Sequence, residues 1–141
     1  MQRTDHLISN VPESRVSEAV ITRDAKGKSV AQYNVAAWLY LRGTQGLSVS
    51  LVLNYQDGTV RREVTVDQGT LDQRGRVMLS GIARLSFLKR ISDLQIRLQT
   101  TAQIGKPTVE ELFFEALEKV DAEPKEATSP DKDPLSKMGL L

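Results

Sequence analysis

The sequence predicts an all-β protein, an antiparallel β-sandwich of the immunoglobulin-like kind, followed by one C-terminal amphipathic helix and a disordered tail. From about residue 31 to residue 98, apolar and polar residues alternate, which is the period of a strand with one buried face. From residue 108 to residue 120, apolar residues recur at helical spacing instead. Turn-forming residues separate the alternating runs, so we expect six or seven short strands joined by turns.

Composition divides the chain of 141 residues into four segments. We expect residues 1–14 to form a flexible lead-in, because Pro12 disfavours both a helix and a central strand there. Residues 15–105 would form the sandwich domain and residues 106–120 the helix. Residues 121–141 are rich in Pro, Glu, Lys, Asp and Ser, which predicts a disordered acidic linker that ends in a short apolar terminus.

The domain is expected to begin with a weak strand from Arg15 to Arg23 and a turn over Asp24–Gly27. The strand after this turn is predicted to be the most buried one. Its inward face carries six residues: Ala31, Tyr33, Val35, Ala37, Leu39 and Leu41. Because Ala36, Trp38 and Tyr40 make the opposite face apolar as well, we expect something to cover that face too.

A β-hairpin is predicted around the pair Asp57-Gly58. The run from Leu47 to Tyr55 alternates cleanly, and Asp-Gly suits the positive φ angles of a type I′ turn. With these two residues as the loop, the register pairs Tyr55 with Val60, Leu51 with Val64, and Val49 with Val66. One residue disagrees with this pattern, because Arg62 then lies on the inward face near the turn.

Two further regions complete the predicted sandwich. Arg76–Leu79 and Ala83–Leu88 are expected to form either two strands or one strand bent at Gly81, since glycine in a strand often marks a bulge. Asp93–Gln99 is the last clear strand, with Leu94, Ile96 and Leu98 directed inward. Short strands separated by turns are typical of a sandwich or a small barrel.

The predicted helix begins after Pro107. Thr108 and Glu111 have the spacing of a capping box, in which each side chain binds a backbone N–H of the first turn. The apolar stripe consists of Val109, Leu112, Phe113, Ala116, Leu117 and Val120. Thirteen residues make a marginal helix in isolation, so either the protein's own sheet or another chain must cover this stripe. Phe114 lies off the stripe and is the residue that we expect to touch something else.

Several kinds of chemistry find no support in the sequence. There is no cysteine, which excludes disulfides and thiolate sites, and His6 is the only histidine. No glycine pattern of the phosphate- or dinucleotide-binding kind is present. We therefore expect a protein that is not an enzyme and that has no cofactor and no metal. The absence of a long apolar run predicts a soluble, cytoplasmic protein with no membrane partner.

The leading functional hypothesis is a protein–protein interaction module, either an adaptor or an assembly subunit. Its partner would be another protein or a second copy of the chain. The stripe and the apolar terminus would bind this partner, through Val109, Leu112, Phe113, Phe114, Leu117, Val120, Leu135, Met138, Leu140 and Leu141.

An alternative hypothesis is nucleic-acid binding. Residues 1–107 carry a net charge of +6 and residues 108–141 a net charge of −5, so an acidic tail could compete for a basic surface. Strand parity places Arg61, Arg76, Arg84 and Arg97 outward, where they could share one sheet face and meet phosphates. The simpler alternative is a solvated surface.

A third hypothesis is a carbohydrate-binding module. Trp38 and Tyr40 form an aromatic pair on one face of the most buried strand. Such a pair could stack on sugar rings, or it could pack beneath the C-terminal helix.

Overall fold

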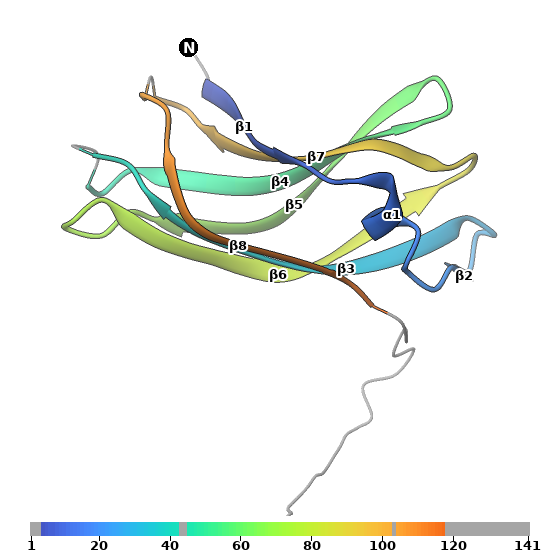
Figure 1. Ribbon diagram of the computed structural model, residues 1–141. Helices are drawn as coiled ribbons and strands as arrows, with labels where there is room; N and C mark the ends of the chain where they lie inside the picture. The colour runs from blue at the N-terminus through green and yellow to red at the C-terminus, as the bar shows by residue number, and fades with distance from the viewer. Residues whose placement is uncertain (1–3, 43–44, 103, 118–141) are drawn as a thin grey trace, which may run out of the picture.

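Two four-stranded antiparallel sheets pack face to face (Figure 1). This computed structural model describes residues 4–42, 45–102 and 104–117. Sheet A contains, in spatial order, β1 (Thr4–Asn10), β7 (Ile91–Thr100), β4 (Ser48–Asp57) and β5 (Val60–Thr70). In sheet B, β3 (Ser29–Tyr40) pairs with β6 (Arg76–Phe87) on one side and with β2 (Thr22–Arg23) and β8 (Thr108–Ala116) on the other. The predicted all-β antiparallel class is confirmed; the immunoglobulin-like arrangement stays a prediction.

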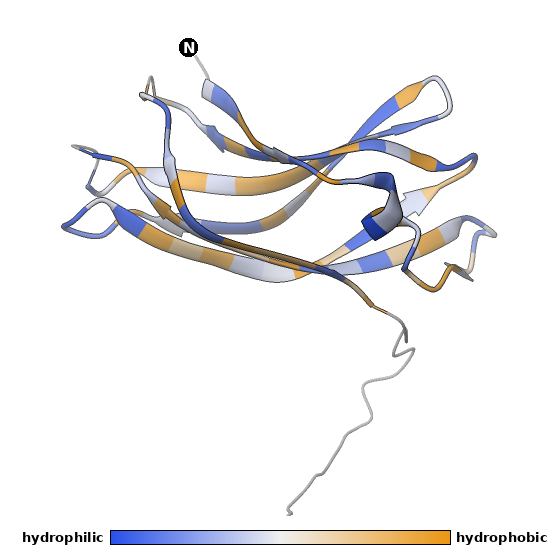
Figure 2. Ribbon diagram, in the orientation of Figure 1, coloured by the Kyte–Doolittle hydropathy of each residue, from blue (hydrophilic) through white to orange (hydrophobic). Residues whose placement is uncertain are grey.

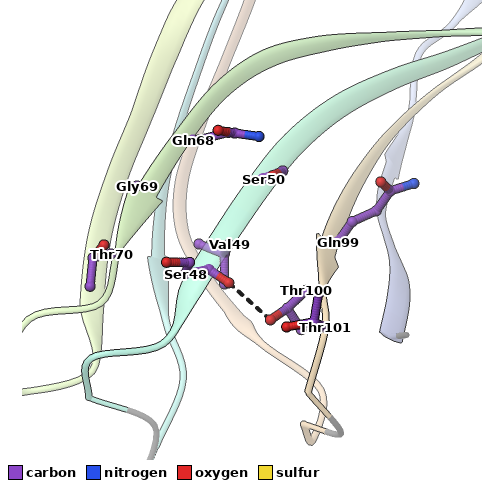
Figure 3. Close-up of a pocket in the computed structure, with 9 residues that line it drawn as sticks. All are labelled: Ser48, Val49, Ser50, Gln68, Gly69, Thr70, Gln99, Thr100 and Thr101. Carbon is purple, nitrogen blue, oxygen red and sulfur yellow. Dashed lines mark hydrogen bonds between the residues drawn. The ribbon is translucent and has the colours of Figure 1, made fainter. Parts of the chain in front are cut away.

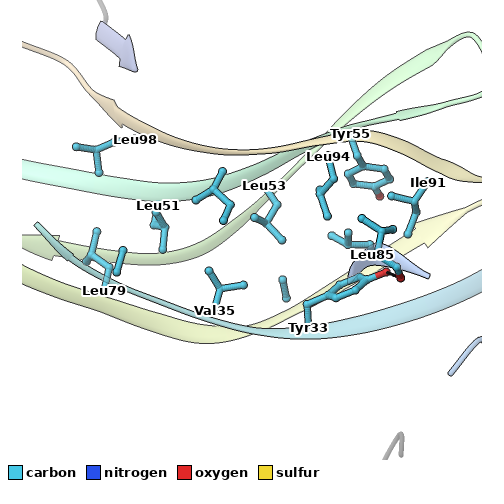
Figure 4. Close-up of a cluster of buried hydrophobic side chains, with 14 of the residues drawn as sticks. Tyr33, Val35, Leu51, Leu53, Tyr55, Leu79, Leu85, Ile91, Leu94 and Leu98 are labelled. Atoms are coloured by element: carbon cyan, nitrogen blue, oxygen red, sulfur yellow. Dashed lines mark hydrogen bonds between the residues drawn. The ribbon is translucent and has the colours of Figure 1, made fainter. Parts of the chain in front are cut away.

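The core lies between the two sheets, and the period-2 pattern places it there. The predicted inward residues of β3, from Ala31 to Leu39, are fully buried, and Leu41 just beyond the strand is 3% exposed. They meet the inward leucines of β4, β6 and β7 (Figure 4). Apolar and polar residues alternate along most strands, as expected for sheets with one buried face (Figure 2). The predicted inward faces of these strands are confirmed.

The predicted C-terminal helix is wrong where the structure describes it. Residues 108–116 form strand β8, which pairs with β3 from Tyr33 to Tyr40. As a strand, this segment gains backbone hydrogen bonds to β3, and Leu112 and Phe114 pack against the core. Pairing therefore outweighs a helix that is marginal by itself. Residues 118–120 of the predicted helix and the predicted tail lie outside the described residues.

The N-terminal region also differs from its prediction. The expected flexible lead-in contains β1, which pairs with β7 with a register shift between Leu7 and Ser9. Pro12 ends this strand and is the N-cap of the short helix α1 (Glu13–Val16). Helix α1 and the short strand β2 occupy the region where one strand from Arg15 to Arg23 was expected. Local alternation was misleading here, because the segment crosses from sheet A to sheet B.

The predicted hairpin between β4 and β5 exists, but its loop is shifted by one residue. Asp57 pairs with Val60, so the two-residue loop is Gly58-Thr59, and Gly58 has a φ of +63°. Partners on β5 therefore move by two positions, and Tyr55 faces Arg62 instead of Val60. A shift of two residues keeps the same face inward, so the buried pattern survives. Beyond Leu51, a bulge changes the register again.

The alternative of one continuous strand around Gly81 is confirmed, although Gly81 marks no bulge. Strand β6 pairs with β3 without a register shift from Arg76 to Phe87. A Cβ atom at Gly81 would lie 2.7 Å from the backbone oxygen of Val66 on β5. Glycine therefore allows the edges of the two sheets to approach each other at this point.

Candidate interaction surface

The outer face of sheet B carries a group of exposed apolar side chains, which we call the outer patch. It consists of Trp38 (37% exposed), Met78 (51%), Ile82 (61%) and Phe113 (42%). On β3, Trp38 lies directly opposite Met78 of β6, and Ala36 lies directly opposite Phe113 of β8. Ile82 lies opposite Asn34, two residues along β3 from Ala36. Side chains at such direct and diagonal positions are neighbours on one sheet face.

Charged residues of opposite sign border the outer patch on its two sides. Arg76 and Arg84 belong to β6, on the side of the patch away from β8. Glu111 and Glu115 belong to β8, and they flank Phe113 on the same face. One border of the outer patch is therefore basic and the other is acidic.

One end of the outer patch is closed by a cluster around Tyr40. The guanidinium of Arg76 lies 5.4 Å from the centre of the Tyr40 ring, and Arg76 Nη2 is 3.3 Å from Glu110 Oε2. The clustered charges limit the apolar surface at this end, and they also fix Tyr40 beneath Arg76. Among the described residues, nothing covers the central part of this face, so the expectation that Trp38 lies under another element is wrong.

The predicted stripe on residues 108–120 is divided between two faces by the strand. Leu112 and Phe114 pack against the core, and the Phe114 ring stacks on Tyr33 with a centroid distance of 5.0 Å. Phe113 points outward instead. The expectations for the two phenylalanines are thus reversed. In a helix, Phe113 would lie on the apolar stripe and Phe114 beside it, whereas in a strand neighbouring side chains point to opposite faces.

The remaining predicted partner-binding residues have varied positions. Val109 lies opposite Leu39, where it is 37% exposed, and Leu117 donates its N–H to the backbone oxygen of Gln32. Five of the predicted residues lie outside the described residues: Val120, Leu135, Met138, Leu140 and Leu141. Met78 and Ile82 were not predicted as binding residues. The alternation along β6 could have identified them, because it places both side chains on the outward face of the strand.

The four arginines of the nucleic-acid hypothesis do not share one sheet face. Arg76 and Arg84 lie on sheet B, whereas Arg61 and Arg97 lie on sheet A. Both arginines of sheet A are paired with carboxylates: Arg61 Nη1 lies 2.7 Å from Asp93 Oδ2, and Arg97 Nε lies 2.6 Å from Asp5 Oδ1. Arg61 also donates to the amide oxygen of Asn54. The expectation of one shared basic face is therefore wrong.

Sheet A has a polar depression of about 520 Å³ at the end where β4 begins and β5 and β7 finish (Figure 3). Its lining is uncharged: Ser48, Val49, Ser50, Gln68, Gly69, Thr70, Gln99, Thr100 and Thr101. Thr100 Oγ1 donates to the backbone oxygen of Ser48 at 2.9 Å. Such a surface offers hydrogen bonds but no general acid or base. It lies on sheet A, whereas Trp38 and Tyr40 belong to sheet B, so the aromatic pair and the depression do not form one site.

Buried polar groups in the described part of the chain have structural partners. Tyr33 donates its hydroxyl to the backbone oxygen of Val16 at 2.7 Å, and Tyr55 donates to that of Ser86 at 2.7 Å. Burial raises the pKa of both phenols, so these hydroxyls stay protonated. His6 Nε2 lies 3.4 Å from the backbone oxygen of Ile104. These groups hold the fold and do not converge on a common cavity.

The described residues contain neither a metal-binding cluster nor a membrane-spanning helix. No cluster of three or more His, Cys, Asp or Glu side chains there could hold a metal ion. No helix in the same part of the chain is long and apolar enough to cross a membrane.

Comparisons with known proteins do not identify a family. No protein-family model matches the chain, and no curated protein matches it. The chain is similar in structure to part of a Clostridium thermocellum N-terminal endo-1,4-β-D-xylanase, crystallised as its CBM22-1 and GH10 modules complexed with xylohexaose. That similarity has a TM-score of 0.44 at 9% sequence identity, and it covers 80% of this chain and 27% of that chain. A likeness at this level does not identify a function.

Proposed function

We propose that the chain is a non-enzymatic protein–protein interaction module that binds a second copy of itself through the outer patch. The observation that carries this proposal is the exposure of Trp38, Met78, Ile82 and Phe113 on one face of sheet B. Contiguous exposed apolar residues with a polar border are characteristic of interaction surfaces. The proposal keeps the interaction role expected from the sequence but moves it from a helix to a sheet face.

The charges around the outer patch favour a second copy as the partner. When two such faces meet across a two-fold axis parallel to the strands, β6 of one copy lies over β8 of the other. The basic border with Arg76 and Arg84 then lies over the acidic border with Glu111 and Glu115 of the second copy. Opposite charges face each other twice in such an isologous contact, which favours this arrangement over others.

The size of the surface predicts a weak dimer. The largest apolar patch on a typical monomer is roughly 300–600 Å², whereas a stable interface buries about 800 Å² on each partner. The area that four partly exposed side chains can bury is smaller than the area that a stable interface buries on each partner. We therefore expect a dissociation constant of about 10–500 μM, with exchange between monomer and dimer at the concentrations used in solution work.

The test is sedimentation of the full chain over a concentration series, with the variant Ile82→Ser. Ile82 is the most exposed member of the outer patch. Because a dimer contains two copies of Ile82, the substitution would remove two isoleucine side chains from its interface. Burying about half of an isoleucine side chain contributes roughly 1 kcal/mol, so the dimer would lose about 2 kcal/mol. This corresponds to an increase of about thirtyfold in the dissociation constant.

The matched control is Leu88→Ser, which removes an equally exposed apolar side chain (65%) from the connection between β6 and β7. Its backbone N–H, which binds Asp57, is unchanged by this substitution. We expect Leu88→Ser to associate as the unmodified chain does. A chain that stays monomeric at about 1 mM would overturn the proposal. Equal effects of the two substitutions would overturn it as well.

A further inference from the structure

Strand β8 forms an edge of sheet B with backbone groups directed away from the sheet. The N–H of Leu117 donates to the oxygen of Gln32 at 2.9 Å. These two residues continue the register of β3 and β8 by one position beyond the pair Tyr33 and Ala116. Hydrogen-bonded pairs recur at every second position of an antiparallel ladder, so Glu111, Phe113 and Glu115 bond to β3. The N–H and C=O groups of Leu112 and Phe114 therefore point to the open edge.

An apolar groove lies beside this edge, between the two sheets. It has a volume of about 230 Å³, and its apolar lining comes from Val11, Pro12, Ile96, Leu112 and Phe114. Its lining residues belong to β8 of sheet B, to β7 and the end of β1 in sheet A, and to α1. A strand added to β8 would direct alternate side chains into this groove, because side chains opposite Leu112 and Phe114 share their face.

The charge of β8 restricts which strand can be added. It carries Glu110, Glu111 and Glu115 and no basic residue. A second copy of β8 at this edge would place glutamates against glutamates, which is unfavourable. Arg15 Nη1 already donates to the backbone oxygen of Phe114 at 3.2 Å, so a basic group of the chain itself occupies one of the outward acceptors.

We propose that β8 binds an extended segment of a partner protein in which basic and apolar residues alternate, as an additional antiparallel strand of sheet B. The apolar side chains would enter the groove beside Leu112 and Phe114. The basic side chains would lie on the outer face next to Glu111 and Glu115, and backbone hydrogen bonds would join the two strands. This inference goes beyond self-association through the outer patch, because it concerns the edge of sheet B and a different partner.

The test uses the full chain and a synthetic peptide with the sequence Lys-Val-Lys-Val-Lys-Val-Lys, blocked at both ends. In an antiparallel ladder, the valines opposite Leu112 and Phe114 direct their N–H groups to β8, whereas the lysine N–H groups point away. Methylation of the valine nitrogens should weaken binding at least tenfold. Methylation of the lysine nitrogens, which keeps the same charge and composition, should change binding less than twofold. Equal effects of the two methylations would overturn the proposal.

Substitutions on the protein locate the peptide. Glu111→Gln with Glu115→Gln should weaken binding several-fold at low salt, because both opposite charges are removed. Arg15→Ala should strengthen binding several-fold, because it frees the oxygen of Phe114. Unchanged or weaker binding by the Arg15→Ala chain would place the peptide elsewhere and overturn the proposal.

One variant separates this inference from the proposed self-association. Ile82 lies on β6, with β3 between it and β8. At protein concentrations far below the dissociation constant of the dimer, Glu111 and Glu115 of both chains face no second copy. The Ile82→Ser chain should therefore bind the peptide there as the unmodified chain does. Loss of peptide binding in this variant would overturn the assignment to the edge of β8. Normal dimers without peptide binding would overturn only the strand-addition proposal.

Discussion

Asp57 is a buried carboxylate whose replacement by asparagine should destabilise the protein measurably. Only 3% of the residue is exposed. Its Oδ2 accepts hydrogen bonds from the N–H of Leu88 and from Nε of Arg62, both at 2.9 Å, and its Oδ1 accepts from the N–H of Lys89 at 2.7 Å. These bonds attach the β4–β5 hairpin to the start of the connection between β6 and β7. An asparagine has one acceptor oxygen, so at least one of these donors would face an NH₂ group.

The magnitude follows from the pKa of Asp57. Burial by itself would raise this pKa, but the N–H groups of Leu88 and Lys89 and the guanidinium of Arg62 outweigh it and lower the pKa from 3.8 to about 2. The difference corresponds to about 2 kcal/mol in favour of the folded carboxylate. One buried donor left without an acceptor costs about 1–3 kcal/mol, which is a similar value. We expect Asp57→Asn to lower the free energy of unfolding by about 2–3 kcal/mol at pH 7.

The pH dependence gives the sharper test. Because the folded pKa lies below the unfolded value, the contribution of Asp57 is complete above pH 3.8 and disappears as the pH falls towards 2. The difference in unfolding free energy between the unmodified chain and Asp57→Asn should therefore shrink over this range. Urea unfolding followed by circular dichroism at pH 7, 4 and 2.5 measures it. Other carboxylates titrate in both proteins, so their contributions cancel in the difference.

The matched control is Asp93→Asn. Asp93 also pairs with an arginine, Arg61, but its side chain is 59% exposed, and such pairs contribute about 0–1 kcal/mol. Asp93 has a φ of +48°, which asparagine tolerates as well as aspartate does. If Asp57→Asn costs no more than Asp93→Asn, or if its cost is the same at pH 7 and pH 2.5, the reasoning about the buried carboxylate is refuted.

Two further pairs of variants test the fold around the interaction surfaces. Phe114→Ala should lower the free energy of unfolding by about 2–4 kcal/mol, because the partly buried Phe114 packs against the core, whereas Phe113→Ala should cost less than 1 kcal/mol. Equal costs in urea unfolding would contradict the orientation of β8. Gly81→Ala should cost about 1–3 kcal/mol, because the new Cβ atom would lie 2.7 Å from the backbone oxygen of Val66. Gly105→Ala is the control, because a Cβ atom at that position would meet nothing within 4 Å. If the two variants were equally stable in thermal unfolding, the close approach of the two sheets at Gly81 would be refuted.

The inward face of β3 illustrates what local sequence can predict. Alternation over ten or more residues specifies both the strand and the face that it buries, because neighbouring side chains of a strand point in opposite directions. Its inward positions are buried as expected. The outer patch does not follow from the alternation of β3, because alternation alone does not say whether the opposite face of a strand is covered. Only the position of the other elements shows that Trp38 remains exposed.

The hairpin between β4 and β5 shows that the register of two strands cannot always be predicted from their sequence. Asp57-Gly58 is a suitable turn pair, and the sequence correctly places a hairpin there. The loop nevertheless begins one residue later, with Asp57 directed into the protein. The partners of its carboxylate, Leu88 and Lys89, lie about thirty residues further along the chain. A register set by such a distant contact is not contained in the pattern of the two strands themselves.

By itself, the sequence determined an all-β antiparallel protein, its buried strand faces and the place of its central hairpin, since all three follow from local alternation and turn chemistry. Tertiary structure alone decided the conformation of residues 108–116. Their apolar residues fit a helical stripe as well as they fit a strand, and a helix that short is marginal by itself. The open edge of β3 offered backbone partners along most of the segment, and this made it a strand. The outer patch and the acidic edge of sheet B both follow from that pairing.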